Sequence, residues 1–302
     1  MQYRLLQQQD LPALEGFLSA HTSSTMFLRS NLRAAGMGRR NNHRLSADYY
    51  GAVSETGDIH AVIAHMQAGN ILVQGGGHED GNHTLSALAA YCRNRLTGRI
   101  AGVLGPSQAA KMLHNAFDLP SDAFAVNHDE TLYTLALDAV KPVVHPLGDS
   151  YQVEDAARMD RATLLRWMRQ YEIEALNAEE NLALDGRVAS RVVNALEDRC
   201  WWVLFADGQP VALAGFNARL PDAVQLGPVW TPPSHRNMGY ARFLVGRCLL
   251  AARARGVKRA VLFTNNPAAR RAYEALGFVA IGTYCLSQLR QPVSIGDQCA
   301  GV

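Results

Sequence analysis

The sequence predicts a mixed α/β (α+β) fold that consists of two related domains. The chain has 302 residues, and at about 100 to 200 residues per domain this length favours two domains. Its residues are 48% hydrophobic and 19% charged, which is typical of a globular protein with a substantial core. The strongest observation is that both halves repeat one order of elements: an opening helix, a three-strand meander, a loop, and then a helix, a strand and a second helix.

In the first half, Asp10 is a candidate N-cap for the opening helix. The apolar residues after it have the spacing of a helix that packs on one side: Leu11, Leu14, Phe17 and Leu18. Apolar runs bounded by turn residues predict the meander strands at 49–53, 59–66 and 71–73. The remaining elements are expected as a helix at 83–96, a strand at 100–104 and a helix at 107–117.

The second half follows the same plan from Asp160, the next candidate N-cap. Its opening helix carries a one-sided apolar stripe: Leu164, Met168, Tyr171 and Ala175. The meander strands are expected at 200–205, 211–217 and 223–230, with a bulge at Gly227–Pro228 because both residues disrupt a regular ladder. A helix at 240–255, a strand at 260–264 and a helix at 267–276 complete this half.

A weak internal repeat accompanies this shared plan. The segment Arg99–Leu104 matches Lys258–Phe263, and Ala109–Lys111 matches Ala268–Arg270. The period is far longer than that of a solenoid, so it indicates two copies of one domain. Two prolines and a glycine between the copies suit a short, stiff connector. We therefore expect a first domain at 1–140, a linker at 141–149 and a second domain at 150–302.

Charge and cysteine content narrow the class of partner. The net charge is only +2, from 29 basic and 27 acidic residues, so we expect neither nucleic acid nor a membrane as partner. No apolar stretch is long enough to span a bilayer, and the polar N-terminal segment suggests a cytoplasmic protein. The five cysteines form no Cys-x-x-Cys pair, which favours reduced thiols and no metal site. The sequence carries no signal for an oligomeric state.

The loop after the strand at 223–230 has the features of an anion site. It opens directly into an apolar helix, whose first turn presents backbone N–H groups and the positive end of the helix dipole. Arg236 adds a charge that can pair with a phosphate, and Gly239 permits the close approach of a ligand. The pattern predicts a pyrophosphate cradle.

Two motifs in order identify a family resemblance. Arg236-x-x-Gly239-x-Ala241 is followed by a strand and then by the segment Asn265–Phe278. Across Val211–Leu289 the chain resembles the GNAT superfamily of CoA-dependent N-acetyltransferases, and the helical stretch 160–196 fits the family's opening helices. The resemblance implies two tandem GNAT-like domains, each a bent mixed β-sheet flanked by helices, and acetyl-CoA as cosubstrate.

The resemblance also implies roles for individual residues. Val229 and Thr231 would offer main-chain groups to the pantetheine arm and the thioester carbonyl, Asn266 would bond the pantetheine region, and Tyr273 would protonate the departing thiolate. The pyrophosphate would be held by Arg236, Asn237, Met238, Gly239, Tyr240 and Ala241. The attack of the amine on the thioester would be direct. Covalent catalysis by a thiol stays an alternative, because Cys285 lies in a predicted strand nearby in the sequence.

The general base is the least determined role. Many family members carry an acidic residue on the fourth strand, but Asp222–Pro228 contains no Glu, and its one Asp stands at its start. The remaining candidates are Glu172, Glu174, Glu179, Glu180 and His235. Each is also readily explained as a solvated surface charge.

The first copy lacks the cofactor loop. In its place stands Gly75–Gly81, where Glu79 and Asp80 would repel a pyrophosphate, and His114 matches Tyr273. We expect a degenerate copy that binds no CoA.

The function expected is N-acetyl transfer to an amine of a small molecule, amino acid or peptide. Two alternatives remain at this stage: a non-catalytic acyl-CoA-binding sensor and an aminoacyl-tRNA-dependent transferase. The intact cofactor loop argues against the latter.

Overall fold

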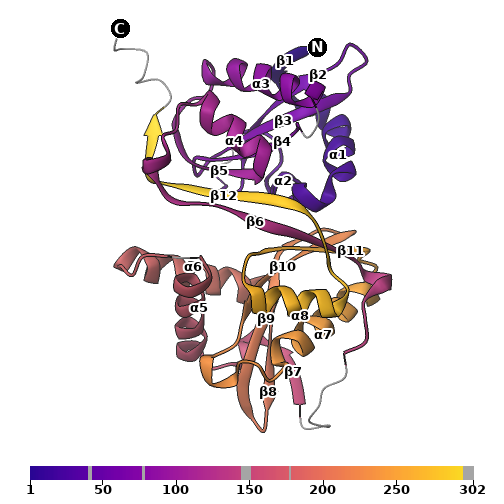
Figure 1. Ribbon diagram of the computed structural model, residues 1–302, viewed down its shortest axis with the longest axis vertical. Coiled ribbons are helices and arrows are strands. Elements are labelled where there is room, and N and C mark those ends of the chain that lie inside the picture. The colour runs from indigo at the N-terminus through magenta and orange to yellow at the C-terminus, as the bar shows by residue number, and fades with distance from the viewer. Residues whose placement is uncertain (40–42, 77–78, 144–150, 177, 295–302) are drawn as a thin grey trace. The chain divides into compact units, whose positions relative to one another are not determined.

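The computed structural model describes residues 1–39, 43–76, 79–143, 151–176 and 178–294. The chain forms two compact units, each a β-sheet flanked by helices (Figure 1). Unit 1 contains Met1–Leu132 and Ile281–Val302, and unit 2 contains Tyr133–Ala280. Among the described residues, no helix is both long and apolar enough to cross a membrane.

Unit 1 has helices on both faces of its sheet. The strands lie in the order β1-β2-β3-β4-β5-β12-β6, and β4 pairs with β5 in parallel. One core packs α1 and α2 on the sheet, and the other packs α3 and α4. The elements are β1 (Gln2–Leu5), α1 (Leu11–Ala20), α2 (Thr22–Ala35), β2 (Ala47–Val53), β3 (Ile59–Met66), β4 (Asn70–Gln74), α3 (Glu79–Arg93), β5 (Arg99–Pro106), α4 (Ser107–Ala116) and β6 (Phe124–Ala136).

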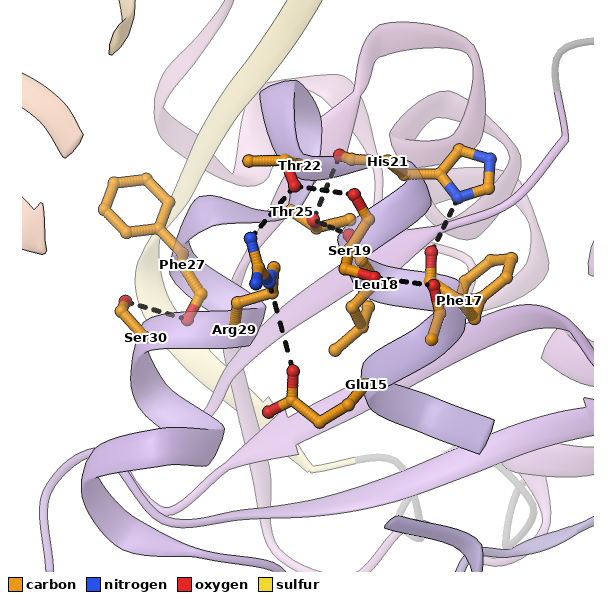
Figure 2. Close-up of polar contacts among 11 residues, drawn as sticks. Glu15, Phe17, Leu18, Ser19, His21, Thr22, Thr25, Phe27, Arg29 and Ser30 are labelled. Atoms are coloured by element: carbon orange, nitrogen blue, oxygen red, sulfur yellow. Dashed lines mark hydrogen bonds and ion pairs between the residues drawn. The ribbon is translucent and has the colours of Figure 1, made fainter. Parts of the chain in front are cut away.

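The helix pair α1–α2 contains a buried arginine. Arg29 of α2 donates to Thr22 Oγ1 at 2.9 Å, and its Nε lies 4.0 Å from Glu15 Oε2 of α1 (Figure 2). A buried guanidinium needs such partners because desolvation of an unpaired charge is costly. The Glu15 contact therefore links α2 to α1, whereas the bond to Thr22 lies within α2.

Unit 2 repeats this plan. Within this unit the strands lie in the order β11-β10-β9-β8-β7, and β10 pairs with β11 in parallel. α5 and α6 cover one core, and α7 and α8 cover the other. The elements are β7 (Tyr151–Asp155), α5 (Arg161–Leu176), α6 (Leu182–Glu197), β8 (Trp201–Ala206), β9 (Gln209–Arg219), β10 (Ala223–Trp230), α7 (Tyr240–Ala254), β11 (Arg259–Thr264) and α8 (Pro267–Leu276). The strand after α8, β12 (Val279–Ser294), belongs to unit 1 from Ile281 onward.

The α+β fold class is confirmed, and the expected helices and strands occur in the expected sequence in both halves. The expectation that each half opens with a helix is wrong, because a strand, β1 or β7, comes first, and a second opening helix, α2 or α6, follows. Asp160 accepts a hydrogen bond from the backbone N–H of Thr163 at 2.8 Å, as an N-cap does. Four of the five cysteines are free and buried: Cys92, Cys200, Cys248 and Cys285. Cys299 lies outside the described residues.

The compact units are divided differently from the domains expected at 1–140 and 150–302. The chain leaves unit 1 within β6 and returns to it within β12. β12 pairs antiparallel with β5, from Tyr284 opposite Pro106 to Ser294 opposite Arg99. The last strand of the chain therefore completes the sheet of unit 1. Of the linker expected at 141–149, residues 144–149 lie outside the described residues.

Two glycines of unit 2 test how tightly its sheet is packed. A Cβ on Gly215 would lie 2.1 Å from the Trp201 ring and 2.8 Å from the Cys200 carbonyl, whereas a Cβ on Gly186 of α6 meets nothing within 4 Å. We expect Gly215→Ala to lower the free energy of unfolding by about 1–3 kcal/mol through overpacking. Gly186→Ala should raise it by up to about 1 kcal/mol, because alanine favours the helix. Urea denaturation measures the free energy of unfolding of both variants. Equal changes in Gly215→Ala and Gly186→Ala would contradict the packing described.

Candidate functional site

The end of β10 separates from β11. The parallel pairing runs from Ala223 opposite Arg259 to Gln225 opposite Val261, while β10 continues to Trp230 and β11 to Thr264. The register with β9 also shifts between Leu226 and Val229, which confirms the bulge expected at Gly227–Pro228. On the side away from β9, the main-chain groups of β10 beyond Gln225 therefore face a gap in the ladder rather than a strand partner.

At the bulge, the side chain of Asn217 lies close to the backbone of Gly227. A Cβ on Gly227 would lie 2.4 Å from Asn217 Nδ2 of β9, and the φ of Gly227 is +146°. Only glycine fits this conformation and this approach. The Asn217 amide is consequently held against the bulge.

The loop from β10 to α7 ends in a left-handed glycine. Asn237 has φ +64°, and Gly239, the N-cap of α7, has φ +80°. Nothing lies within 4 Å of a Cβ built on Gly239, and Met238 beside it is 49% exposed. The first turn of α7 contains no acidic residue. The amides of this turn thus border open space at the positive end of a helix.

Arg236 is held by three partners. Its Nε donates to the Thr231 carbonyl at 3.0 Å, its Nη2 donates to Glu174 Oε2 at 2.8 Å, and its Cζ lies 4.9 Å from the Trp230 ring centroid. The ion pair is largely exposed, so it contributes at most about 1 kcal/mol. The structure therefore shows Arg236 joining the start of the loop to α5.

Asn266 and Tyr273 lie on α8. Asn266 Oδ1 accepts hydrogen bonds from the N–H groups of Ala268 at 2.9 Å and Ala269 at 3.1 Å, so it is the N-cap of the helix. Tyr273 is 8% exposed and its ring packs edge-on against Phe278 at 5.8 Å. The tyrosine is thus fixed within the core between α7, α8 and the sheet.

Three of the candidate bases are in ion pairs. Glu174 is bound by Arg236, and two further pairs join Glu172 to Arg191 and Glu180 to Arg169. The His235 ring lies 6.2 Å from the Tyr240 ring, in an edge-on arrangement. Each of these three carboxylates thus has a guanidinium as its partner.

Cys285 has a different environment. It lies in β12 and is 1% exposed. Burial raises the pKa of its thiol to about 11, so the thiol is protonated at neutral pH. A reactive thiolate at this position is therefore disfavoured, which leaves direct attack as the simpler route.

Comparison with known proteins places the loop and its helix in a family. Residues 162–278 match the model of the acetyltransferase (GNAT) family. This segment belongs to the GNAT family. The resemblance inferred from the two motifs is therefore confirmed, and unit 2 contains the GNAT domain.

Solved structures share the fold at low sequence identity. A Drosophila protein has 13% identity and a TM-score of 0.59, covering 95% of this chain and 98% of its own. GCN5-related N-acetyltransferases from Sphaerobacter thermophilus and Kribbella flavida each have 15% identity, with TM-scores of 0.53 and 0.52. They cover 97% and 91% of this chain, and 95% and 96% of their own. The sequence matches none of the curated proteins.

Unit 1 differs from the GNAT domain at the corresponding helix. The first turn of α3 carries Glu79 and Asp80, where α7 has no acid. His114 is 8% exposed, its Nε2 lies 2.9 Å from Ser287 Oγ, and burial lowers its pKa. Residues 77 and 78 of the glycine-rich segment lie outside the described residues. The described part is consistent with a copy that has lost the anion site.

A cavity of about 300 Å³ lies at the other end of α7. Cys248 and Arg255 line it together with Val224, at the start of β10, and with Trp202 and Phe216. The N-terminus of α7 and the bulge of β10 do not line this cavity, so it is separate from the loop between β10 and α7.

The sequence reasoning missed the residues that surround the bulge. Arg191 of α6 joins Glu172 of α5 to Asn217 of β9, and Gln225 of β10 is 1% exposed. Gln225 carried a signal, since it is a polar residue inside an otherwise apolar strand. No sequence signal predicted the contacts of Arg191, because they join residues of three separate elements.

Asn266 provides a test that separates capping from ligand binding. Asn266→Ala should lower the free energy of unfolding by about 1 kcal/mol, because two helical N–H groups lose their acceptor. Asn266→Asp should retain stability, since aspartate caps equally well. Urea denaturation measures both variants. If Asn266→Asp lowers the free energy of unfolding as much as Asn266→Ala does, helix capping is not the role of the Asn266 side chain.

Proposed function

We propose that the protein is an N-acetyltransferase that moves an acetyl group from acetyl-CoA to an amine of a small molecule, amino acid or peptide by direct attack. The observation that carries the proposal is the open, left-handed Gly239 at the start of α7, in a domain of an acetyltransferase family. Nucleic acid and membranes are not among the partners we propose.

The loop fits a pyrophosphate. The space beside Gly239 is the space that a Cβ would begin to fill, and it adjoins the amides of the first turn of α7. Asn237, Met238, Gly239, Tyr240 and Ala241 would supply this cradle with their main chain. The bonds of Arg236 to Thr231 and Glu174 give it a different role, namely to hold the loop in shape.

The gap between β10 and β11 fits the pantetheine arm. Val229 and Thr231 have main-chain groups at this end of β10, and a backbone N–H aimed at the thioester carbonyl would stabilise its developing negative charge. Removal of one such donor typically costs about 3 kcal/mol of barrier. In this arrangement Asn266 caps the helix that presents Tyr273, and the Tyr273 hydroxyl would donate a proton to the departing sulfur.

A second candidate is a non-catalytic acyl-CoA sensor. It is favoured by the arginine partners of Glu172, Glu174 and Glu180 and by a glutamine, Gln225, in β10. Thiol release from acetyl-CoA over a panel of amino acids, polyamines, aminoglycosides and peptides decides between the two. Binding without release on any amine would favour the sensor, and no binding at millimolar acetyl-CoA would refute both.

Substitution of Gly239 tests the cradle directly. Gly239→Glu should abolish acetyl-CoA binding, because it adds both bulk and negative charge where the pyrophosphate would lie. Gly256→Glu is the matched control: it follows the other end of α7, has φ +91°, and also has nothing within 4 Å of a Cβ. Both variants carry similar backbone strain. Calorimetry should show binding in the control alone, and equal affinities would place the cofactor elsewhere.

Substitution of Tyr273 tests the acid. Tyr273→Phe should lower kcat by a factor of the order of 10², the usual contribution of a general acid, and leave acetyl-CoA affinity nearly unchanged. The ring packing against Phe278 is retained in this variant. Steady-state thiol release and calorimetry measure the two quantities. An unchanged kcat would remove the acid role from this residue.

A further inference from the structure

The cavity at the C-terminal end of α7 has no part in the proposed acetyl transfer. Its volume of about 300 Å³ lies at the lower end of the range for small-molecule sites. Its walls are apolar side chains in or against the core between α7 and the sheet: Trp202, Phe216, Val224, Cys248 and Ala252. Arg219, Ala251 and Arg255 also line it and are exposed, so the cavity opens to solvent at these three residues.

The sequence of α7 explains why this space exists. Cys248, Ala251, Ala252 and Arg255 recur at the spacing of one helical face, and the first three have small side chains. On the sheet side the cavity is bounded by the rings of Trp202 and Phe216, which pack edge-on with centroids 5.2 Å apart. Burial raises the pKa of the Cys248 thiol to about 12, so this wall is uncharged at neutral pH.

Two arginines from different elements reach the rim of the cavity. Arg219 of β9 is paired with Val224 of β10, whose side chain lies beneath α7, so both side chains point to that face of the sheet. Its Nη2 donates to the Asp198 carbonyl at 2.8 Å. Arg255 is the C-cap of α7. Among the described residues, neither guanidinium has a carboxylate oxygen within 4.0 Å.

This combination selects the chemistry of a ligand. A carboxylate accepts parallel hydrogen bonds from a guanidinium, so it is the natural partner for the two rim arginines. A doubly charged phosphate fits less well, because the C-terminal end of α7 carries the negative end of the helix dipole. An aromatic ring suits the interior, since it can pack against Trp202 and Phe216 as these two rings pack against each other.

We propose that the cavity binds a small aromatic monocarboxylate. The ring lies between α7 and the Trp202–Phe216 pair, and the carboxylate is held at the rim by Arg219 and Arg255. This is a second ligand site of unit 2, and it does not depend on the proposed acetyl transfer.

Calorimetry on the full chain tests the site with indole-3-acetate, phenylacetate and the neutral indole-3-acetamide. Wild type should bind at least one of the two carboxylates at millimolar concentration or below. It should bind the amide at least about tenfold more weakly than indole-3-acetate, because the amide lacks the charge that the arginines recognise.

Substitution of the rim arginines tests the carboxylate contact. Arg219→Gln and Arg255→Gln should each weaken indole-3-acetate binding by about threefold to fivefold, the size expected for an exposed ion pair. Arg253→Gln is the matched control. It removes the same charge at the same end of α7, but Arg253 donates to the Leu137 carbonyl at 3.4 Å and does not line the cavity. It should bind as wild type.

Filling the cavity tests where the ring lies. Ala252 is 5% exposed, and in Ala252→Leu the added atoms should enter space that is already present. Binding of indole-3-acetate should be lost, while the free energy of unfolding is unchanged or higher, as for other cavity-filling substitutions. The arginine variants leave the core intact, so they decide the proposal even where Ala252→Leu does not fold.

Three results would overturn the proposal. The first is that neither carboxylate binds wild type at millimolar concentration, and the second is that indole-3-acetate and its amide bind equally well. The third is that Arg253→Gln weakens binding as much as Arg255→Gln does. Gly239→Glu should bind indole-3-acetate as wild type, and a loss there would place the compound at the cofactor loop instead. Each of these results leaves the proposed acetyl transfer as it stands.

Discussion

The separation of β10 from β11 is the constraint on which the GNAT domain depends. Regular pairing ends at Gln225 and Val261, and the bulge at Gly227 then turns the rest of β10 out of register with β9. A strand that stayed paired would have no free main-chain groups for a ligand, because each N–H and C=O group would already form a hydrogen bond with a neighbouring strand. The bulge is in turn possible because Gly227 allows the Asn217 amide to approach to a distance that a side chain would block.

The elements around this gap are connected to one another through polar contacts. Arg236 joins the cofactor loop to Glu174 of α5, while Arg191 joins Glu172 of the same helix to the bulge. α5 is thus linked both to the loop before α7 and to the bulge of β10. Since the Glu174–Arg236 pair is exposed and the Glu172–Arg191 pair is not, the second should be the more persistent of the two.

Most of the fold was predictable because local signals agreed with tertiary packing. The stripe after Asp160 and the turn residues of the meander placed α5 and β8 to β10 within a few residues of their observed bounds. β12 was harder, because its first five residues are exposed and its pairing with β5 joins distant parts of the chain. In the site, Gly239 and Asn266 were predictable from motif spacing, whereas the partners of Arg236 depend on where α5 packs. A sequence shows that an arginine is present but not which carboxylate lies beside it.

The two units share one architecture and differ at the helix that follows the meander, α3 in unit 1 and α7 in unit 2. Unit 1 has a contact between its opening helices, from Arg29 of α2 to Glu15 of α1 (Figure 2), and unit 2 has the Arg191–Glu172 pair between α6 and α5. That contact is internal to the helix pair, whereas Arg191 reaches the sheet through Asn217. The first turn of α3 is free to carry Glu79 and Asp80, because acids at a helix N-terminus stabilise the helix by about 0.3–1 kcal/mol. The first turn of α7 carries no acid, and the open space beside its N-cap Gly239 leaves room there for an anion from outside the chain.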